Sequence, residues 1–299
     1  AFVNGSPQSF NVCLNSTGNA INSLLAVSDA DAAQTLTWTV TTPPTNGSLS
    51  GVASYTATST GGTVTPTGMT YTPTASYSGS DVFVIQVSDG VATATTTVNV
   101  TVNPLPTITF SVTPNPSCTG TSTNFNGSGS YPTYNWDFGD LSTDTGNPTS
   151  HTYGAFGTYT ASITVTDNNG CSAGTSKAVT VNAVPTVTVN TVSPICEGFG
   201  TTLNATGGTT YVWTPGTGLS ATTGASVTAS PTVTTTYTVT GTTSGCSNIA
   251  TVTVSVNALP TVSAGSNVTI CTGNNTTLTA SGATTYTWAP NTNLSATTG

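Results

Sequence analysis

Basic residues are almost absent from this chain. Lysine and arginine together occur once, at Lys177, against nine acidic residues, and charged residues make up 3% of the sequence. Ordinary soluble domains carry roughly 25% charged residues. Binding to nucleic acid or to an anionic membrane surface requires clustered cations, so the composition argues against both as partners.

Long hydrophobic runs are also missing. No stretch approaches the ~18 consecutive apolar residues of a membrane-spanning helix. No basic segment followed by an apolar one opens the chain as a signal peptide would. We therefore expect no direct membrane insertion, and we expect any export signal or anchor to lie outside these residues.

The strong helix formers are scarce as well. There is one methionine, and lysine, arginine and glutamate are nearly missing. Short runs that alternate valine, threonine and aromatic residues are present instead, separated by glycine, asparagine, serine and proline. This pattern is typical of β-sandwiches. It predicts an all-β fold.

A repeat with a fixed offset organises the chain. Val181-Asn182-Ala183-Val184-Pro185 reappears as Val256-Asn257-Ala258-Leu259-Pro260, and a related segment begins at Val102. Such self-similarity predicts tandem immunoglobulin-like modules joined by short, stiff junctions and arranged as an elongated rod. Residue 299 falls within a repeat, so we expect a longer repetitive protein. The predicted domains are 1–104, 105–183, 184–258 and a truncated copy, 259–299.

Four of the six cysteines fall into two similar pairs. Cys118 and Cys171 in the second module, and Cys196 and Cys246 in the third, are each separated by about 50 residues. The spacing predicts one disulfide within each module, which would stabilise it by roughly 4 kcal/mol and implies an oxidising, extracellular location. Zinc is the competing interpretation, but the chain has no C-x-x-C motif and one histidine.

Two cysteines remain without a partner in this scheme. The partner of Cys271 is expected about 50 residues further on, by analogy with the other pairs. Cys13 is left to pair upstream, to pair between chains or to stay a buried free thiol.

The second module carries a specific motif. Trp136-Asp137-Phe138-Gly139-Asp140 is followed by His151-Thr152-Tyr153 and by an alternating run that begins at Gly157. This strongly resembles the PKD domain. The resemblance implies an immunoglobulin-like sandwich of the kind found in surface proteins and as accessory modules of secreted hydrolases.

The other modules resemble different families. The first, with Ser28-Asp29-Ala30-Asp31 and Val87-Ser88-Asp89-Gly90, is similar to the cadherin-like repeats of large bacterial adhesins. The third and fourth resemble the threonine-rich Ig-like repeats of giant bacterial surface proteins. That class includes gliding-motility adhesins, which are exported by the type IX route.

Aromatic residues recur at fixed places. Trp136, Trp213 and Trp288 each follow a cysteine of their module at almost the same spacing. A repeated position in successive sandwiches indicates core rather than a sugar-stacking platform. Trp38 has no such repeat and stays open. The predicted structural core comprises Trp136, Trp213, Trp288, Tyr159, Tyr237 and His151, with a catalytic base as the weaker alternative for His151.

Aspartates supply the candidate metal ligands. Asp29 and Asp31 lie on one side of an extended segment, and Asp81 or Asp89 would complete a calcium site in the first module. Asp137, Asp140 and Asp144 allow two interpretations, turn capping or a second calcium site. Calcium is the one cofactor that these residues suggest.

Together these features favour a non-enzymatic extracellular structural shaft of a repetitive bacterial cell-surface adhesin or filament that projects a distal tip. Its expected partners are other copies of the repeat or of the chain in a fibre. Regions outside these residues would contact a host surface, a substratum or a polysaccharide. The alternatives are carbohydrate-binding modules or the accessory stalk of a secreted hydrolase.

Overall fold

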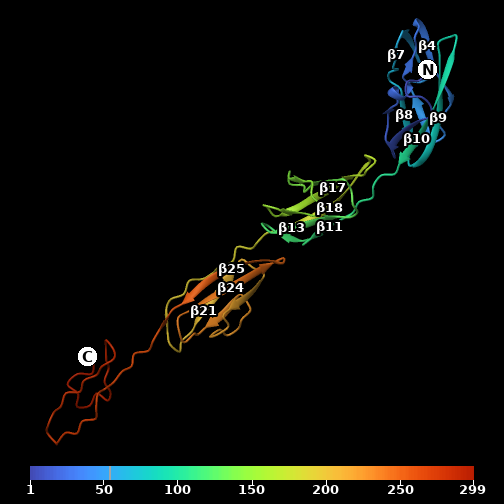
Figure 1. Cartoon of the computed structure of the whole chain (residues 1–299). Helices are drawn as coiled ribbons and strands as arrows, with labels where there is room; N and C mark the ends of the chain where they lie inside the picture. Colours follow the sequence, from blue (N-terminus) through green and yellow to red (C-terminus); the bar gives the residue numbers. More distant parts are fainter. Residues whose placement is uncertain (54) are drawn as a thin grey trace. The chain divides into compact units, whose positions relative to one another are not determined.

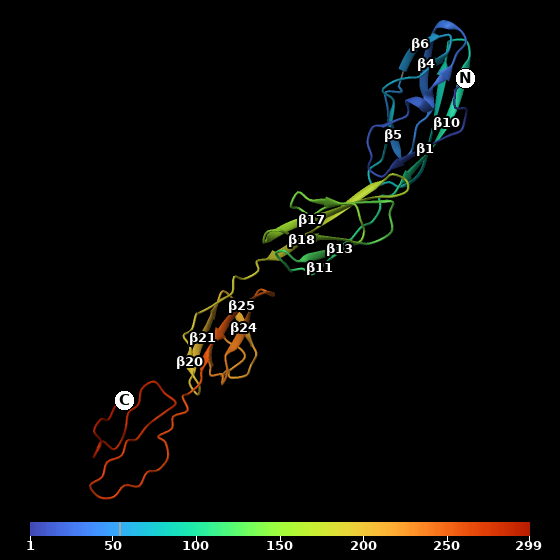
Figure 2. The same cartoon turned by 60° about the vertical axis from the view of Figure 1, so that its left-hand side comes forward.

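A computed structural model describes residues 1–53 and 55–299. Within them, every regular element is a β-strand except one 3-10 turn, η1, at Asn22–Leu25. The chain divides into two compact units, residues 1–181 with two sandwiches and residues 182–299 with one (Figures 1 and 2). The predicted all-β fold of Ig-like sandwiches is confirmed. No helix within the described residues could span a membrane.

The first sandwich pairs a five-stranded sheet, β1-β10-β9-β4-β6, with a three-stranded sheet, β2-β8-β5, and adds a β3-β7 pair. Its core contains Trp38, Tyr71 and Phe83, all fully buried. The strands are β1 Gln8–Cys13, β2 Asn19–Ala20, β3 Val27–Ser28, β4 Ala32–Thr42, β5 Gly47–Ser50, β6 Tyr55–Thr60, β7 Thr63–Val64, β8 Thr70–Pro73, β9 Gly79–Ser88 and β10 Thr93–Asn103.

The second sandwich has a three-stranded sheet, β11-β13-β16, and a five-stranded sheet, β12-β18-β17-β14-β15. Phe125, Trp136 and Phe138 pack together in its core. The strands are β11 Phe110–Thr113, β12 Ser117–Cys118, β13 Ser122–Gly127, β14 Thr133–Asp137, β15 Thr143–Asp144, β16 Thr149–Thr152, β17 Gly157–Thr166 and β18 Ser172–Asn182.

The third sandwich is formed by the sheets β19-β21-β23 and β22-β24-β25 and by the pair β20-β26. Leu203, Trp213 and Tyr237 lie at its centre. The strands are β19 Thr188–Val189, β20 Ile195–Cys196, β21 Thr201–Thr206, β22 Thr210–Thr214, β23 Ser226–Ala229, β24 Thr235–Thr243, β25 Cys246–Val254 and β26 Val256–Asn257.

The fourth copy does not form the sandwich that the repeat predicts. Residues 258–299 contain only isolated bridges, Ser263–Ser281 and Thr287–Thr298. In the third sandwich the strands β21 and β22 pair with β23 and β24, which follow Gly224. Within this chain the fourth copy stops at Gly299, the counterpart of Gly224, and so lacks those partners.

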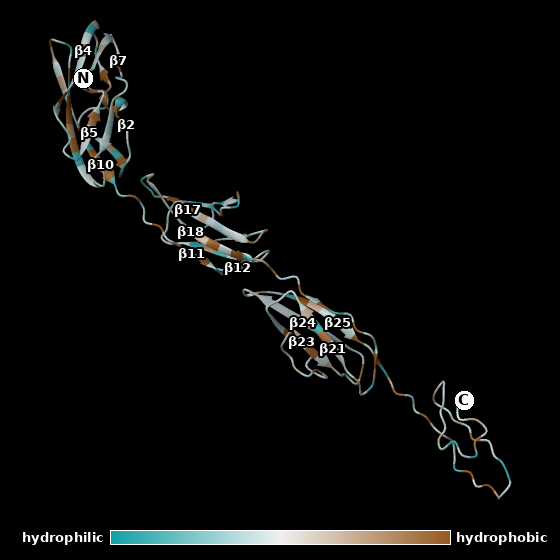
Figure 3. Cartoon of the chain, turned by 180° about the vertical axis from the view of Figure 1, so that it is seen from behind, coloured by the Kyte–Doolittle hydropathy of each residue, from teal (hydrophilic) through white to brown (hydrophobic). Residues whose placement is uncertain are grey.

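Strict alternation builds each core. Along β10 the valines 98, 100 and 102 point inward and are almost fully buried, while the residues between them face outward; Figure 3 colours these strands by hydropathy. The buried indoles satisfy their polar N–H groups on backbone carbonyls. Nε1 of Trp38, Trp136 and Trp213 donates to the oxygens of Leu25, Gly146 and Gly224 at 3.0, 2.8 and 2.9 Å.

Substitutions of two adjacent residues on β22, Trp213 and Val212, test this packing. Trp213 is 1% exposed and Val212 is 51% exposed on the opposite face. Trp213→Ala removes a buried indole and should lower the free energy of unfolding of the third sandwich by about 3–5 kcal/mol. Val212→Ala should cost less than about 0.5 kcal/mol. Hydrogen exchange of residues 186–257 during urea unfolding measures both, and equal losses would contradict the assignment.

Candidate functional site

The carboxylate of Asp81 is a buried structural acceptor. The side chain is 5% exposed. Oδ1 accepts from the backbone N–H groups of Thr45 and Val82 at 3.0 and 2.9 Å and from the Thr45 hydroxyl. Oδ2 accepts from Asn46 N–H at 3.1 Å and from the Tyr71 hydroxyl at 2.8 Å. Both oxygens are therefore occupied by protein donors.

These contacts set the ionisation of the pair. Burial raises the pKa of the Asp81 carboxyl, but hydrogen bonds from Tyr71 and from the backbone outweigh burial and hold the pKa below its usual value. Burial, together with the Asp81 charge, raises the pKa of the Tyr71 hydroxyl well above its usual range. Asp81 is thus kept ionised without a metal.

The predicted calcium ligands of the first module do not come together. Asp29 Oδ1 accepts from Asp31 N–H at 3.3 Å, and Asp89 Oδ1 accepts from Val91 and Ala92 N–H. Asp29 and Asp89 border one shallow depression, but no third carboxylate joins them. Among the described residues, no group of three or more His, Cys, Asp or Glu side chains could hold a metal. The ligand set Asp29, Asp31 and Asp81 is therefore not assembled.

The aspartates of the second module cap turns. Asp137 Oδ1 accepts from Gly139 N–H at 2.8 Å, and Asp144 Oδ1 accepts from the N–H groups of Thr145 and Gly146. Gly139 has a φ of +81°, and a Cβ there would lie 2.6 Å from the Thr160 carbonyl oxygen. The turn requires glycine, and the geometry fits the turn-capping interpretation.

His151, Asp140 and Ser142 form a hydrogen-bonded cluster. Nε2 of His151 lies 2.7 Å from Asp140 Oδ2 and 3.3 Å from Ser142 Oγ, and the imidazole stacks on Phe138. A catalytic relay needs the carboxylate and the serine on opposite ring nitrogens. Here both contact the same nitrogen, and Ser142 also donates directly to Asp140. The cluster does not have the geometry of a triad.

Burial raises the pKa of the Asp140 carboxyl, but the hydrogen bonds from Ser142 and His151 outweigh it and lower the pKa. Burial and the nearby Asp140 charge raise the pKa of Tyr153 to about 12. The hydrogen bonds of His151 to Asp140 and Ser142, and its stacking on Phe138, tie β16 to the turn after β14.

The other predicted core residues differ in burial. Trp136, Trp213 and Tyr237 are buried, Tyr159 is half-buried and stacks on Tyr153, and Trp288 is half-buried in the fourth copy. Trp38, left open by the sequence, is fully buried. The tryptophans of the three sandwiches therefore offer no exposed stacking surface.

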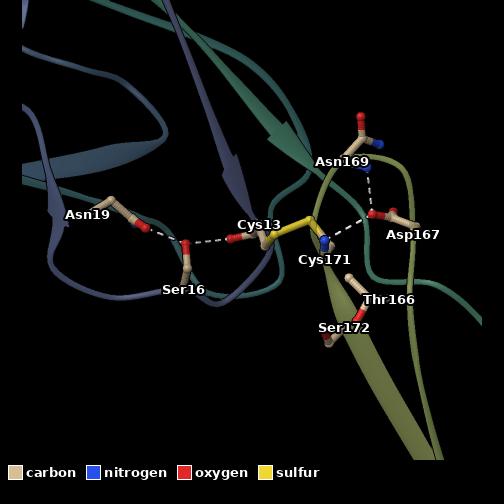
Figure 4. The surroundings of a disulfide bond; sticks show 8 residues. All are labelled: Cys13, Ser16, Asn19, Thr166, Asp167, Asn169, Cys171 and Ser172. Carbon is tan, nitrogen blue, oxygen red and sulfur yellow. Dashed lines mark hydrogen bonds between the residues drawn. A yellow bond between two sulfur atoms is a disulfide. The ribbon is translucent and has the colours of Figure 1, made fainter. Parts of the chain in front are cut away.

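A disulfide joins the first two sandwiches. Cys13, at the end of β1, bonds to Cys171, which precedes β18, with the Cα atoms 5.5 Å apart (Figure 4). Asp167 Oδ1 accepts from the N–H groups of Cys171 and Asn169, both at 2.9 Å, and so shapes the turn that presents Cys171. Ser16 Oγ donates to the Cys13 carbonyl at 2.6 Å.

This bond corrects the predicted pairing Cys118–Cys171. Asn115 forms hydrogen bonds with the backbone of Ala178 and Thr180, near the end of β18. Cys118, three residues after Asn115, therefore lies toward that end of the strand, whereas Cys171 lies at its start. Cys118 is disulfide-bonded, but not to Cys171. The two cysteines of the module are separated by most of the length of a strand, whereas a disulfide requires Cα atoms within about 7 Å.

The predicted pairing Cys196–Cys246 is also wrong. Cys196 is an exposed free thiol, as is Cys271, while Cys246 is buried and disulfide-bonded. Cys196 lies opposite Asn257 at the end of β26, whereas Cys246 begins β25. The chain from Cys246 to Asn257 spans roughly 36 Å when extended. Similar sequence spacing suggests a closed module, but the fold places the two cysteines at opposite ends of it.

The Asp81 contacts generate a stability prediction. Asp81→Asn leaves backbone donors facing an amide and should destabilise the first sandwich by about 2–3 kcal/mol. Because the folded pKa of Asp81 is depressed, its contribution is present above about pH 4 and lost as pH falls through the folded pKa. The variant should therefore show a shallower acid loss of stability in urea titrations from pH 7 to pH 2. The matched control is exposed Asp31→Asn, and equal behaviour of the two variants would contradict the assignment.

Comparison with known families supports tandem Ig-like domains. Residues 6–103 match the bacterial Ig domain family, and residues 103–183 match the PKD domain family. For the first module, where cadherin-like repeats were the expected relatives, the matching family is thus a bacterial Ig domain. These domains and the disulfides indicate an extracellular or surface protein.

Individual relatives share less. A microbial collagenase of Vibrio alginolyticus is 43% identical over 49 residues, which are 16% of this chain and 6% of the collagenase. An I-band fragment of titin, I67–I69, is 14% identical with a TM-score of 0.36, covering 85% of this chain and 97% of the fragment. A structure of carbohydrate-binding modules from the β-sandwich superfamily is 22% identical with a TM-score of 0.26, covering 46% and 54%.

Proposed function

We propose that this chain is a non-enzymatic extracellular shaft, part of a bacterial cell-surface adhesin or filament that holds a distal adhesive tip away from the cell. The observation that carries the proposal is the Cys13–Cys171 bond, which links two successive sandwiches instead of closing either one. A covalent link between neighbours transmits tension along a series of modules.

The surfaces fit the same role. The one basic side chain, Lys177, is bound to the Phe110 carbonyl and lies 5.4 Å from the centre of the Phe110 ring. Hydroxyl groups pair across exposed strand faces, as in the cross-strand pairs Thr236–Thr253 and Thr242–Ser247. With 3% charged residues and a formal net charge of −8 spread over 299 residues, neighbouring copies would repel each other weakly, which would permit lateral bundling into a fibre. Export by the type IX route and a part in gliding motility belong to this proposal on the resemblance of the repeats alone.

A second candidate is an accessory stalk of a secreted hydrolase. The short match to a microbial collagenase favours it. Both roles are mechanical and place the chain outside the cell; they differ in what the chain carries. Purification of the whole native protein followed by a collagen-degradation assay separates them. A stalk would belong to a polypeptide that degrades collagen, whereas an adhesin shaft would not.

The shaft proposal predicts an extended molecule in solution. A compact protein of this length would have a radius of gyration of about 19 Å. Three sandwiches in series, each about 36 Å long like the 11-residue strand β18, would give a length above about 110 Å and a radius of gyration above about 30 Å. Small-angle X-ray scattering of the full chain measures this.

The Cys13→Ser variant is the matched control for that measurement. It should keep the same maximum dimension but show a broader distance distribution, because the first two sandwiches are no longer tied. A radius of gyration near the compact value for the unmodified chain would overturn the shaft proposal. Specific retention of the chain by a glycan array would favour carbohydrate binding instead.

A further inference from the structure

Four cysteines of the chain each begin a turn of the same type. In each case the residue three positions later donates its N–H to the cysteine carbonyl, at 3.0–3.1 Å, and the residue two positions later has a positive φ. The turns are Cys13-Leu14-Asn15-Ser16, Cys118-Thr119-Gly120-Thr121, Cys196-Glu197-Gly198-Phe199 and Cys271-Thr272-Gly273-Asn274. We name these four the junction cysteines.

Two junction cysteines occupy the same position in their sandwiches. Cys13 pairs in parallel register with Asn103, and Cys196 pairs in parallel register with Asn257. The residue after each cysteine donates its N–H to that asparagine carbonyl, at 2.8 Å for Leu14 and 3.0 Å for Glu197. Each asparagine is the last strand residue before the junction to the next module. Cys196 therefore occupies the position in the third sandwich that Cys13 occupies in the first.

Cys171 and Cys246 form a second class, the hairpin cysteines. Each directly follows a positive-φ glycine in the turn between the last two long strands, Gly170 or Gly245. Both are buried and disulfide-bonded. Cys171 bonds to the junction cysteine of the preceding sandwich.

The hairpin of the third sandwich contacts Asn182, the asparagine at which its own compact unit begins. Cys246 Sγ lies 3.8 Å from the carbonyl oxygen of Asn182, the counterpart of Asn103 and Asn257 in the repeat. Asn182 Nδ2 donates to the Ser244 carbonyl at 2.8 Å. A hairpin cysteine thus lies near a junction asparagine in both cases: Cys171 is bonded to Cys13, which pairs with Asn103, and Cys246 lies beside Asn182.

We propose that the exposed Cys196 thiol is the acceptor for the hairpin cysteine of a complete module placed after Asn257, repeating the link that Cys13 makes with Cys171. The rule is that the junction cysteine of one module bonds to the hairpin cysteine of the next. The inference rests on cysteine geometry alone and is independent of the shaft proposal. It assigns a covalent attachment site to Cys196, whose thiol is free in this chain.

The reaction is a thiol–disulfide exchange. The Cys196 thiolate attacks a disulfide of an extracellular dithiol–disulfide oxidant, forming a mixed disulfide and releasing one oxidant thiolate. The thiolate of the hairpin cysteine then attacks the Cys196 sulfur and displaces the second oxidant sulfur. The two cysteines lose two protons and two electrons in total, and the oxidant leaves as the dithiol.

The repeat supplies the test molecule. Gly299 is the counterpart of Gly224, so appending a copy of residues 225–257 after Gly299 completes the fourth module and adds a copy of Cys246. The oxidised protein is alkylated and mapped by non-reducing peptide mass spectrometry. We expect a peptide linking Cys196 to the added cysteine, and alkylation of Cys196 should fall at least about tenfold because a disulfide sulfur is not a nucleophile.

The matched control carries serine at the added cysteine, and Cys196 should then stay fully alkylated, as in the unextended chain. The proposal is overturned if Cys196 stays alkylated while the added cysteine is free, or if the added cysteine bonds to Cys271 and closes its own module.

A second chimera guards against failure of the completed fourth module to fold. Residues 104–181 replace residues 258–299, which places the second sandwich, with its own hairpin cysteine, directly after Asn257. Hydrogen exchange checks that the transplanted sandwich is protected. A bond from Cys196 to the copy of Cys171 supports the proposal, and a protected sandwich with a free Cys196 overturns it.

Discussion

The length of one strand sets the covalent organisation of this chain. In the third sandwich the hairpin cysteine starts β25 and the junction asparagine ends β26, roughly 36 Å apart in extended chain. The junction cysteine is paired with that asparagine, so the two cysteines of one module lie at opposite ends of it. The two cysteines are too far apart to bond to each other, so each can form a disulfide only with a cysteine outside its own sandwich.

The near absence of charge makes the remaining polar contacts important. Each sandwich encloses a small core, and the buried indole N–H groups and the Asp81 carboxylate find their hydrogen-bond partners within the protein. Unpaired buried groups would each cost about 1–3 kcal/mol, a large share of the stability of a small domain. A disulfide to a neighbouring sandwich therefore adds stability to a domain whose small core supplies little of it.

Much of the fold could be predicted from the sequence, because alternation fixes which side of a strand is buried. The faces of β25 and the buried positions of Trp136 and Trp213 follow from period and spacing alone. The disulfides could not be predicted in this way. Spacing along the chain carries no information about which end of a strand a cysteine occupies, and the short pairing strand β20, with Cys196, gives no period. The prediction of a calcium site was wrong for a related reason. Asp29 and Asp89 accept hydrogen bonds within local turns, whereas Asp81 accepts one from Tyr71 in the core.

The central claim is that neighbouring modules are tied in series through Cys13 and Cys171. Stretching single molecules of the full chain, with and without a thiol reductant, tests it most directly. The bond spans 158 residues, so roughly 550 Å of extended chain should stay hidden until reductant is added. A Cys13→Ser variant should release without reductant the part of that length that precedes Cys118, roughly 370 Å, because Cys118 is itself disulfide-bonded. Full release of both sandwiches from the unmodified, oxidised chain would contradict the account.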